Sequence, residues 1–196
     1  MEELSNFAVK HNIPVTQTVM GYSTMKRDHS HFVGPIGGLG GKAANNLAKE
    51  TDLAICIGTK LADFTTGSWA NFENPQFKLV SINIARHDAN KHLAEAVIGD
   101  AKVSLIELSN ALGDWRSSDS WHKKSQDELK SWNEYVDKES GPTNQELPSY
   151  AHAVGAIYRN SDPTDIAVTA AGGLVGEVVQ VWRPKELNTH ETEWGF

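Results

Sequence analysis

Residues 52–69 read DLAICIGTKLADFTTGSW, and this stretch decides the fold. Residues 53–57 are apolar at every position, which predicts a parallel strand covered on both faces. Gly58 then allows a tight turn at the carboxyl end of the strand, where open α/β sheets bind ligands. The loop that follows carries six polar side chains: Thr59, Lys60, Asp63, Thr65, Thr66 and Ser68. So many donors and acceptors beside a core strand indicate a functional loop for an anionic or polyhydroxyl ligand.

The segments around this stretch alternate between strand and helix patterns. The apolar spacing predicts strands at 13–19, 52–58 and 77–84. It predicts helices at 2–12, 42–50, 88–97 and 103–112, the last with five apolar residues for burial: Val103, Leu105, Ile106, Leu108 and Leu112. Alternation of this kind over residues 1–114 favours an α/β fold with a doubly wound parallel sheet.

The chain changes character after residue 114. Residues 115–148 are polar and charged and carry one amphipathic helix that Gly141-Pro142 ends, which predicts a helical linker. A second α/β pattern then begins, with a helix at 150–159, a strand at 165–169, a glycine turn at 170–174 and a candidate helix from 176 to 182. A strand and a glycine turn do not complete a domain, so we expect an incomplete second α/β unit cut from a longer polypeptide.

Composition narrows the class of function. The 196 residues carry a net charge of −7, with a sequence pI of about 5.6, which argues against a nucleic-acid-binding surface. We expect no membrane association, because no apolar run reaches the roughly 20 residues of a membrane span. Cys56 is the only cysteine, so an intrachain disulfide is impossible and a cytoplasmic protein with a structural, buried thiol is favoured.

Residues 34–41, GPIGGLGG, form a glycine segment in front of the predicted helix at 42–50. Backbone amides there could receive a phosphate at the helix N-terminus, or the glycines could serve close packing of helix and strand. The segment lacks the G-x-G-x-x-G dinucleotide pattern, and Gly41-Lys42-Ala43 lacks the hydroxyl of a P-loop. Both interpretations stay open.

Histidines and acidic residues gather at 28–31 and 87–92, but without the spacing of a metal site. Capping and surface hydrogen bonding are the better interpretation of these residues. Ser68 does not lie in a G-x-S-x-G elbow, and no Ser/His/Asp or Cys/His arrangement can be defended. We therefore predict no catalytic residue and no metal ligand in the chain.

Three patterns together resemble the central domain of thiamine-diphosphate (ThDP) enzymes. They are the run from Ile57 to Trp69, the motif Gly40-x-x-Ala43-Ala44-Asn45, and Gly99-Asp100-Ala101 before a helix. Within that superfamily, D-F-T-T-G-S-W is most similar to the hydrolases of inositol catabolism. Residues 169–174 and 193–196 also resemble the beginning of the third domain of these enzymes.

This resemblance implies three parts. Residues 1–114 would be a Rossmann-like central domain, residues 115–148 a helical linker, and residues 149–196 the truncated start of the diphosphate-binding domain. The family takes its catalytic glutamate from the first domain and a G-D-G…N motif for Mg²⁺ from the third, and neither motif occurs here. The chain alone would therefore be inactive.

The resemblance also implies two ligand regions. Gly40, Gly58, Lys60 and Asp63 match positions near the FAD or ADP site of some relatives. Lys60 stands where the acetolactate synthase pattern has arginine, which argues against a flavin because lysine lacks the planar fork. Gly172, Gly173 and Leu174 match the loop that lies against ThDP, with backbone contacts alone carried over.

The parent enzyme implied by the resemblance uses ThDP and Mg²⁺ to cleave a carbon–carbon bond in a cyclic 1,2-diketone, releasing 5-deoxyglucuronate. It would be a homodimer or homotetramer with a small-molecule substrate. Two alternatives are a lyase or decarboxylase of the acetolactate synthase kind, and a stand-alone module that binds FAD or ADP without catalysis.

Overall fold

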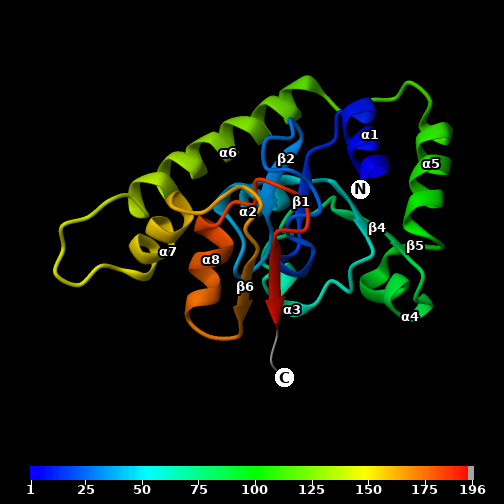
Figure 1. Cartoon of the computed structure of the whole chain (residues 1–196). Coiled ribbons are helices and arrows are strands. Elements are labelled where there is room, and N and C mark those ends of the chain that lie inside the picture. The colour runs from blue at the N-terminus through cyan, green and yellow to red at the C-terminus, as the bar shows by residue number, and fades with distance from the viewer. Residues whose placement is uncertain (194–196) are drawn as a thin grey trace.

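The computed structural model describes residues 1–193, in which helices and strands alternate (Figure 1). In chain order, with η for 3₁₀ helices, the elements are α1 (Glu2–His11), β1 (Val15–Gln17), η1 (Val19–Gly21), β2 (Phe32–Pro35), α2 (Lys42–Glu50), β3 (Leu53–Ile57), α3 (Asp63–Thr66), β4 (Lys78–Asn83), α4 (Arg86–Ala89), η2 (Lys91–Leu93), β5 (Glu95–Ile98), α5 (Ala101–Leu112), α6 (Asp119–Glu139), α7 (Tyr150–Arg159), β6 (Ala167–Ala170), α8 (Leu174–Val181) and β7 (His190–Glu193).

Every strand pair in the described part of the chain is parallel. β1 pairs with β2, β3 and β5 flank β4, and β6 pairs with β7. In the three-stranded sheet, Cys56 lies opposite Ser81, and Ile82 lies opposite Val97. Helices connect successive strands, as α2 does between β2 and β3, and α8 between β6 and β7. The predicted α/β class with parallel strands is confirmed, although the strands form three small sheets.

The helix predicted at 88–97 is wrong. The chain instead forms the short α4, then η2, then the strand β5. His92 and Leu93 have φ of 60° and 58°, which ends the helical path, and the next residues pair with β4. A four-residue strand is too short to display a period of two, so the helical pattern was the stronger signal in the sequence. The strands β2 and β7 are also additional to the predicted set.

The three-stranded sheet is less covered than the sequence indicated. Leu53 is exposed, and the rest of β3 is half-buried. Of the five apolar residues expected to be buried in α5, Leu105 is buried, whereas Val103 and Ile106 are exposed. The reason is geometric: β3 is an edge strand, and α5 packs more against α1 than over the sheet.

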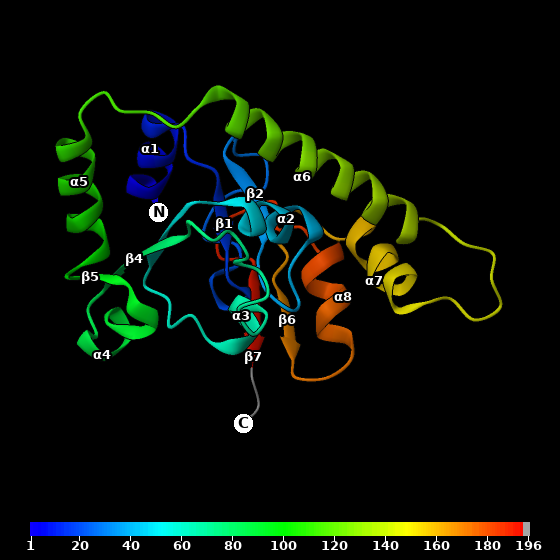
Figure 2. The same ribbon diagram turned by 180° about the vertical axis from the view of Figure 1, so that it is seen from behind.

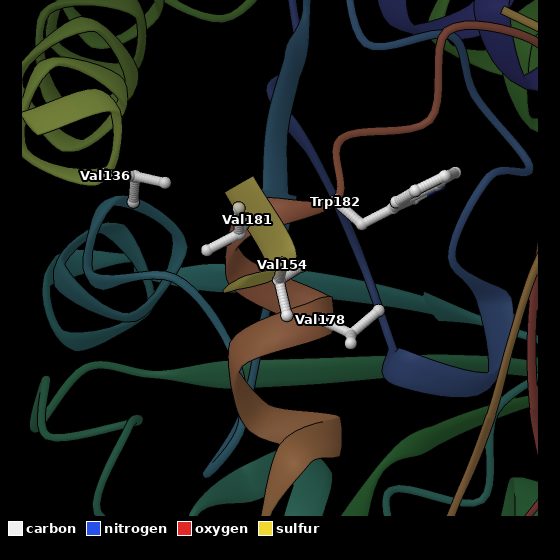
Figure 3. Close-up of a cluster of buried hydrophobic side chains, with 5 residues drawn as sticks. All are labelled: Val136, Val154, Val178, Val181 and Trp182. Atoms are coloured by element: carbon white, nitrogen blue, oxygen red, sulfur yellow. The ribbon is translucent and has the colours of Figure 1, made fainter. Parts of the chain in front are cut away.

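Helix α6 connects the two parts of the chain, as both ribbon views show (Figures 1 and 2). Its first half packs Trp121 and Leu129 against a cluster built on Val33, Ala43 and Leu47. Its second half joins a cluster of α6, α7 and α8 (Figure 3), made of Val136, Val154, Val178, Val181 and Trp182. Helix α6, which the sequence predicts within a linker, therefore packs against two separate hydrophobic clusters.

The C-terminal segment also contacts the loop that follows β1. The N–H of Asn188 donates to Ser23 O over 3.1 Å, and the rings of Tyr22 and His190 meet edge-on with centroids 5.1 Å apart. Lys26 and Glu186 form an exposed ion pair at 2.7 Å. Among residues 1–193, none of the helices has the length and apolar character needed to cross a membrane.

Candidate functional site

The carboxyl ends of β3 and β4 form a rim made of residues 58–63 and Asn83. Gly58 has φ of 64°, and its N–H donates to Ile82 O over 2.9 Å, which continues the strand pairing into the turn. Asn83 Nδ2 donates to Thr59 O over 3.3 Å, while Asn83 Oδ1 accepts from the N–H of Ala85 at 2.9 Å. The asparagine thus ties the two strand ends together, a role that the sequence pattern did not indicate.

Lys60 and Asp63 are the two charged residues of this rim, and both are exposed. Asp63 lies in the first turn of α3. The Lys60 ammonium group acts on Asp88 of α4: a hydrogen bond from Lys91 lowers the pKa of the Asp88 carboxyl, and the charge of Lys60 adds to that effect. The rim therefore presents a cation that a nearby carboxylate partly balances.

The segment after Asp63 owes its shape to a buried threonine. Thr66 is fully buried; its hydroxyl donates to Asp63 O and accepts from the N–H of Trp69, both at 3.3 Å. Gly67, Ser68 and Trp69 then have consecutive positive φ of 59°, 55° and 67°. Two non-glycine residues in this region store strain. Trp69 packs on His92 with ring centroids 4.5 Å apart, so the loops after β3 and β4 meet at this point.

The amides of the glycine segment are used within the protein. The N–H of Gly37 donates to Asn45 Oδ1 over 2.9 Å, and that of Gly38 donates to Phe64 O over 2.7 Å. The N–H groups of Gly40 and Gly41 donate to Gly37 O and Pro35 O. These bonds favour the interpretation of the segment as a close-packing element. A backbone N–H that already donates to an acceptor within the protein is not available to a phosphate.

Gly40 lies in close contact with the backbone of residues 35–37. A β-carbon at this position would stand 2.4 Å from Ile36 C and 2.6 Å from Pro35 O. Gln180 of α8 supports the same segment, since its Nε2 lies 2.5 Å from both Leu39 O and Gly40 O. The sequence held no signal for Gln180, because the contact spans 140 residues.

Gly172, Gly173 and Leu174 form the turn from β6 into α8, which we call the cofactor loop after the ligand that the resemblance implies for it. All three residues are exposed, and a β-carbon on either glycine would meet nothing within 4 Å. Gly173 is the N-cap of α8 and supplies no capping side chain. The loop therefore leaves the backbone at a helix N-terminus open to an anionic group such as a diphosphate.

The remaining polar candidates make local hydrogen bonds. His29 Nδ1 accepts from the N–H of His31, and the Asp100 carboxylate caps α5 by accepting from Lys102 and Val103 amides. In the part of the chain that the structure describes, no three His, Cys, Asp or Glu side chains lie close enough to hold a metal ion. Cys56 is half-buried in β3, and burial raises the pKa of its thiol to about 12.

The structure joins some of the predicted residues and separates others. The glycine segment with Gly40 lies against α3, through the bond from Gly38 to Phe64 O, and against α8, through Gln180. Lys60 and Asp63 belong to the rim, whereas the cofactor loop lies at the other end of α8 from Gln180. One surface depression of about 360 Å³ lies along α6 and is lined by none of these residues.

Comparison with known proteins gives a match to a family model and a set of similar proteins. Residues 1–108 match the family model described as "Thiamine pyrophosphate enzyme, central domain". Proteins named 3D-(3,5/4)-trihydroxycyclohexane-1,2-dione hydrolase from Bacillus anthracis and from Clostridium perfringens strain 13 are 33% and 31% identical over the whole of this chain. A protein from Bacillus cereus, named as hydrolase 1 of that kind, is 34% identical. In each case the chain spans 34% of the relative, about a third of its length.

Proposed function

The chain belongs to the thiamine pyrophosphate enzymes, whose central domain it contains, and from this premise we propose that it is part of a ThDP-dependent hydrolase. Its substrate would be trihydroxycyclohexane-1,2-dione, and the reaction would be hydrolytic cleavage of a ring carbon–carbon bond to 5-deoxyglucuronate in inositol catabolism. The observation that carries this proposal is the similarity of the entire chain to relatives with that name.

The geometry of the cofactor loop agrees with a role in holding ThDP. Bound ThDP supplies a nucleophilic carbon that adds to a carbonyl group and takes up electrons as the adjacent bond breaks. Gly172 and Gly173 would bring backbone amides at the start of α8 to the anionic diphosphate. Leu174 is 46% exposed and would add an apolar contact beside it. We assign no magnesium ligand to this chain.

The rim and the glycine segment would act as support for this loop. Gln180 fixes α8 to the glycine segment, and Asn45 fixes that segment to α2, so the cofactor loop is attached to the central part through α8. An FAD or ADP ligand would have to bind away from Gly37, Gly38, Gly40 and Gly41, whose amides already have acceptors. The packing therefore favours a supporting central domain over the stand-alone nucleotide module.

Calorimetry on the purified chain tests the proposal. ThDP with Mg²⁺, ADP and FAD are titrated separately. We expect no measurable heat with ThDP and Mg²⁺, because the chain lacks the G-D-G…N motif, and none with the nucleotides. Micromolar ThDP affinity would contradict an incomplete cofactor site. Saturable binding of ADP or FAD would instead favour the nucleotide module.

A further inference from the structure

Three histidines from two distant segments form a cluster at the start of α6. His29 and His31 lie in the turn before β2, and His122 lies in the first turns of α6. The rings of His31 and His122 stack with centroids 4.3 Å apart and an interplanar angle of 28°. The rings of His29 and His31 are 5.9 Å apart. This histidine cluster is a place where α6 contacts the N-terminal part of the chain.

The hydrogen bonds of the cluster fix which ring nitrogens carry protons. His122 Nε2 lies 2.9 Å from Ser30 O, and since a carbonyl can only accept, this nitrogen donates. His29 Nδ1 accepts from the backbone N–H of His31 over 3.1 Å, so it must be unprotonated. In this arrangement His29 Nδ1 serves as a hydrogen-bond acceptor.

Asn12, the C-cap of α1, fixes the third ring. Its Nδ2 donates to Ser117 O at 3.2 Å and to Asp119 Oδ1 at 3.1 Å, which leaves Asn12 Oδ1 to accept from His31 Nε2 at 3.2 Å. His31 Nδ1 then accepts from the Ser30 hydroxyl at 2.9 Å. The neutral form of His31 satisfies every one of these partners, and the same network holds residues 117–119, where α6 begins.

We propose that this histidine cluster is an acid-sensitive latch, which holds the start of α6 closed while the His31 ring is neutral and releases it when that ring is protonated. The rest of α6 stays anchored by its apolar contacts with α2 and β2. Opening is therefore confined to the first turns of α6, while the contacts of its second half with α7 and α8 stay in place.

Burial and charge set the direction of this response. The side chain of His31 is 6% exposed, and burial lowers its pKa from 6.5 to about 4, with further lowering by His122, His29 and Arg116. Asp119 is the carboxylate on the same network, and it reaches His31 only through Asn12. Between pH 6.5 and about 4, the released His31 ring binds a proton that the closed latch excludes. Opening therefore becomes up to about tenfold more favourable for each pH unit between 6.5 and about 4.

Amide hydrogen exchange on the whole chain tests the latch. Exchange is measured by mass spectrometry at pH 7.5 and 5.0 and corrected for the intrinsic rate at each pH. We expect residues 117–125 to lose at least tenfold of their protection at pH 5.0 relative to residues 42–50 of α2. Equal protection of 117–125 at the two pH values would overturn the proposal.

Two variants identify the group responsible. His31→Gln keeps an N–H that reaches Asn12 but cannot titrate, so the loss at pH 5.0 should disappear. His87→Gln removes an exposed histidine of α4 and should behave like the unaltered protein. Should His31→Gln fail to fold, NMR titration of the histidine rings in the unaltered chain decides. A His31 pKa near 4 supports the latch, and a value near 6.5 contradicts it.

Discussion

At the residue scale, Gly37 of the glycine segment and Gly58 of the rim differ in the space that is available to a β-carbon. Gly37 has φ of 114°, and a β-carbon there would lie 2.2 Å from Phe64 O and 2.9 Å from Thr65 Cα. Gly58 has φ of 64°, but its β-carbon would meet nothing within 4 Å. Gly37 is required by packing as well as by conformation, whereas Gly58 is required by conformation alone.

This difference predicts unequal costs for the same substitution. Gly37→Ala should destabilise the protein by about 3 kcal/mol, because backbone atoms of α3 would have to move. Gly58→Ala should cost about 1 kcal/mol, the cost of a left-handed conformation in open space. Urea unfolding of both variants measures the two values. Equal costs would mean that the glycine segment does not pack on α3 as described.

At the element scale, α6 is the helix on which both parts of the chain depend. Trp132 packs against the Val33 cluster on one side and the Val136 cluster on the other. Its indole also covers the N-cap of α2, since a β-carbon on Gly41 would lie 2.8 Å from Trp132 Nε1. The amphipathic pattern predicted this helix, but spacing alone could not reveal that two cores share it.

Truncation of Trp132 should therefore weaken both halves at once. We expect Trp132→Ala to cost about 3 kcal/mol, in the range of large core truncations, and to lower the stability of α2 and α8 together. Tyr135→Ala is the matched control: its side chain stacks on Trp132 but is 54% exposed, so its loss should cost within about 1 kcal/mol. Residue-resolved hydrogen exchange in α2 and α8 reads out the coupling. If α8 alone loses protection, Trp132 of α6 does not couple the two clusters.

Strand β7 carries a buried histidine, His190, whose pKa also departs from its ordinary value. Burial lowers the pKa of His190 from 6.5 to about 4, and its Nε2 has no hydrogen-bond partner. Above pH 6.5 both folded and unfolded chains hold it neutral, so stability is complete there. As the pH falls from 6.5 toward 4, the unfolded chain binds a proton that the folded chain excludes, and stability decreases.

His190→Leu should remove this part of the acid sensitivity. The variant is expected to lose less stability than the unaltered protein between pH 7 and 5, as measured by urea midpoints at each pH. His87→Gln again provides the exposed control and should show the unaltered slope. An identical pH slope for His190→Leu would show that His190 titrates near its ordinary value.

Sequence patterns were sufficient for elements set by local signals. The helices α2 and α7 have the predicted bounds, because apolar spacing and flanking breakers define them. The strand β5 was missed because its exposed apolar residues are stabilised by pairing with β4, which no local pattern encodes. The partners of the glycine segment, Gln180 above all, also depend on contacts distant in sequence. The ligand residues themselves stay predictions.

At the scale of the whole molecule, residues 1–108, which match the central-domain family, pack against the elements from α6 to β7. Helix α6, Gln180 of α8 and the contact of Tyr22 with His190 hold the two together. The chain spans about a third of the hydrolases it resembles, so its activity is proposed for a larger protein. Within that protein it would support and position the cofactor loop.

A chimeric enzyme tests this supporting role most directly. The chain replaces the matched 219-residue alignment region of the Bacillus anthracis hydrolase, and the product made from trihydroxycyclohexane-1,2-dione is measured with ThDP and Mg²⁺ present. Circular dichroism and ThDP binding confirm that the chimera is folded and loaded. We expect turnover of the diketone, lost on Gly172→Val. A folded, loaded chimera that leaves the diketone intact, or that decarboxylates pyruvate instead, would contradict the proposed function.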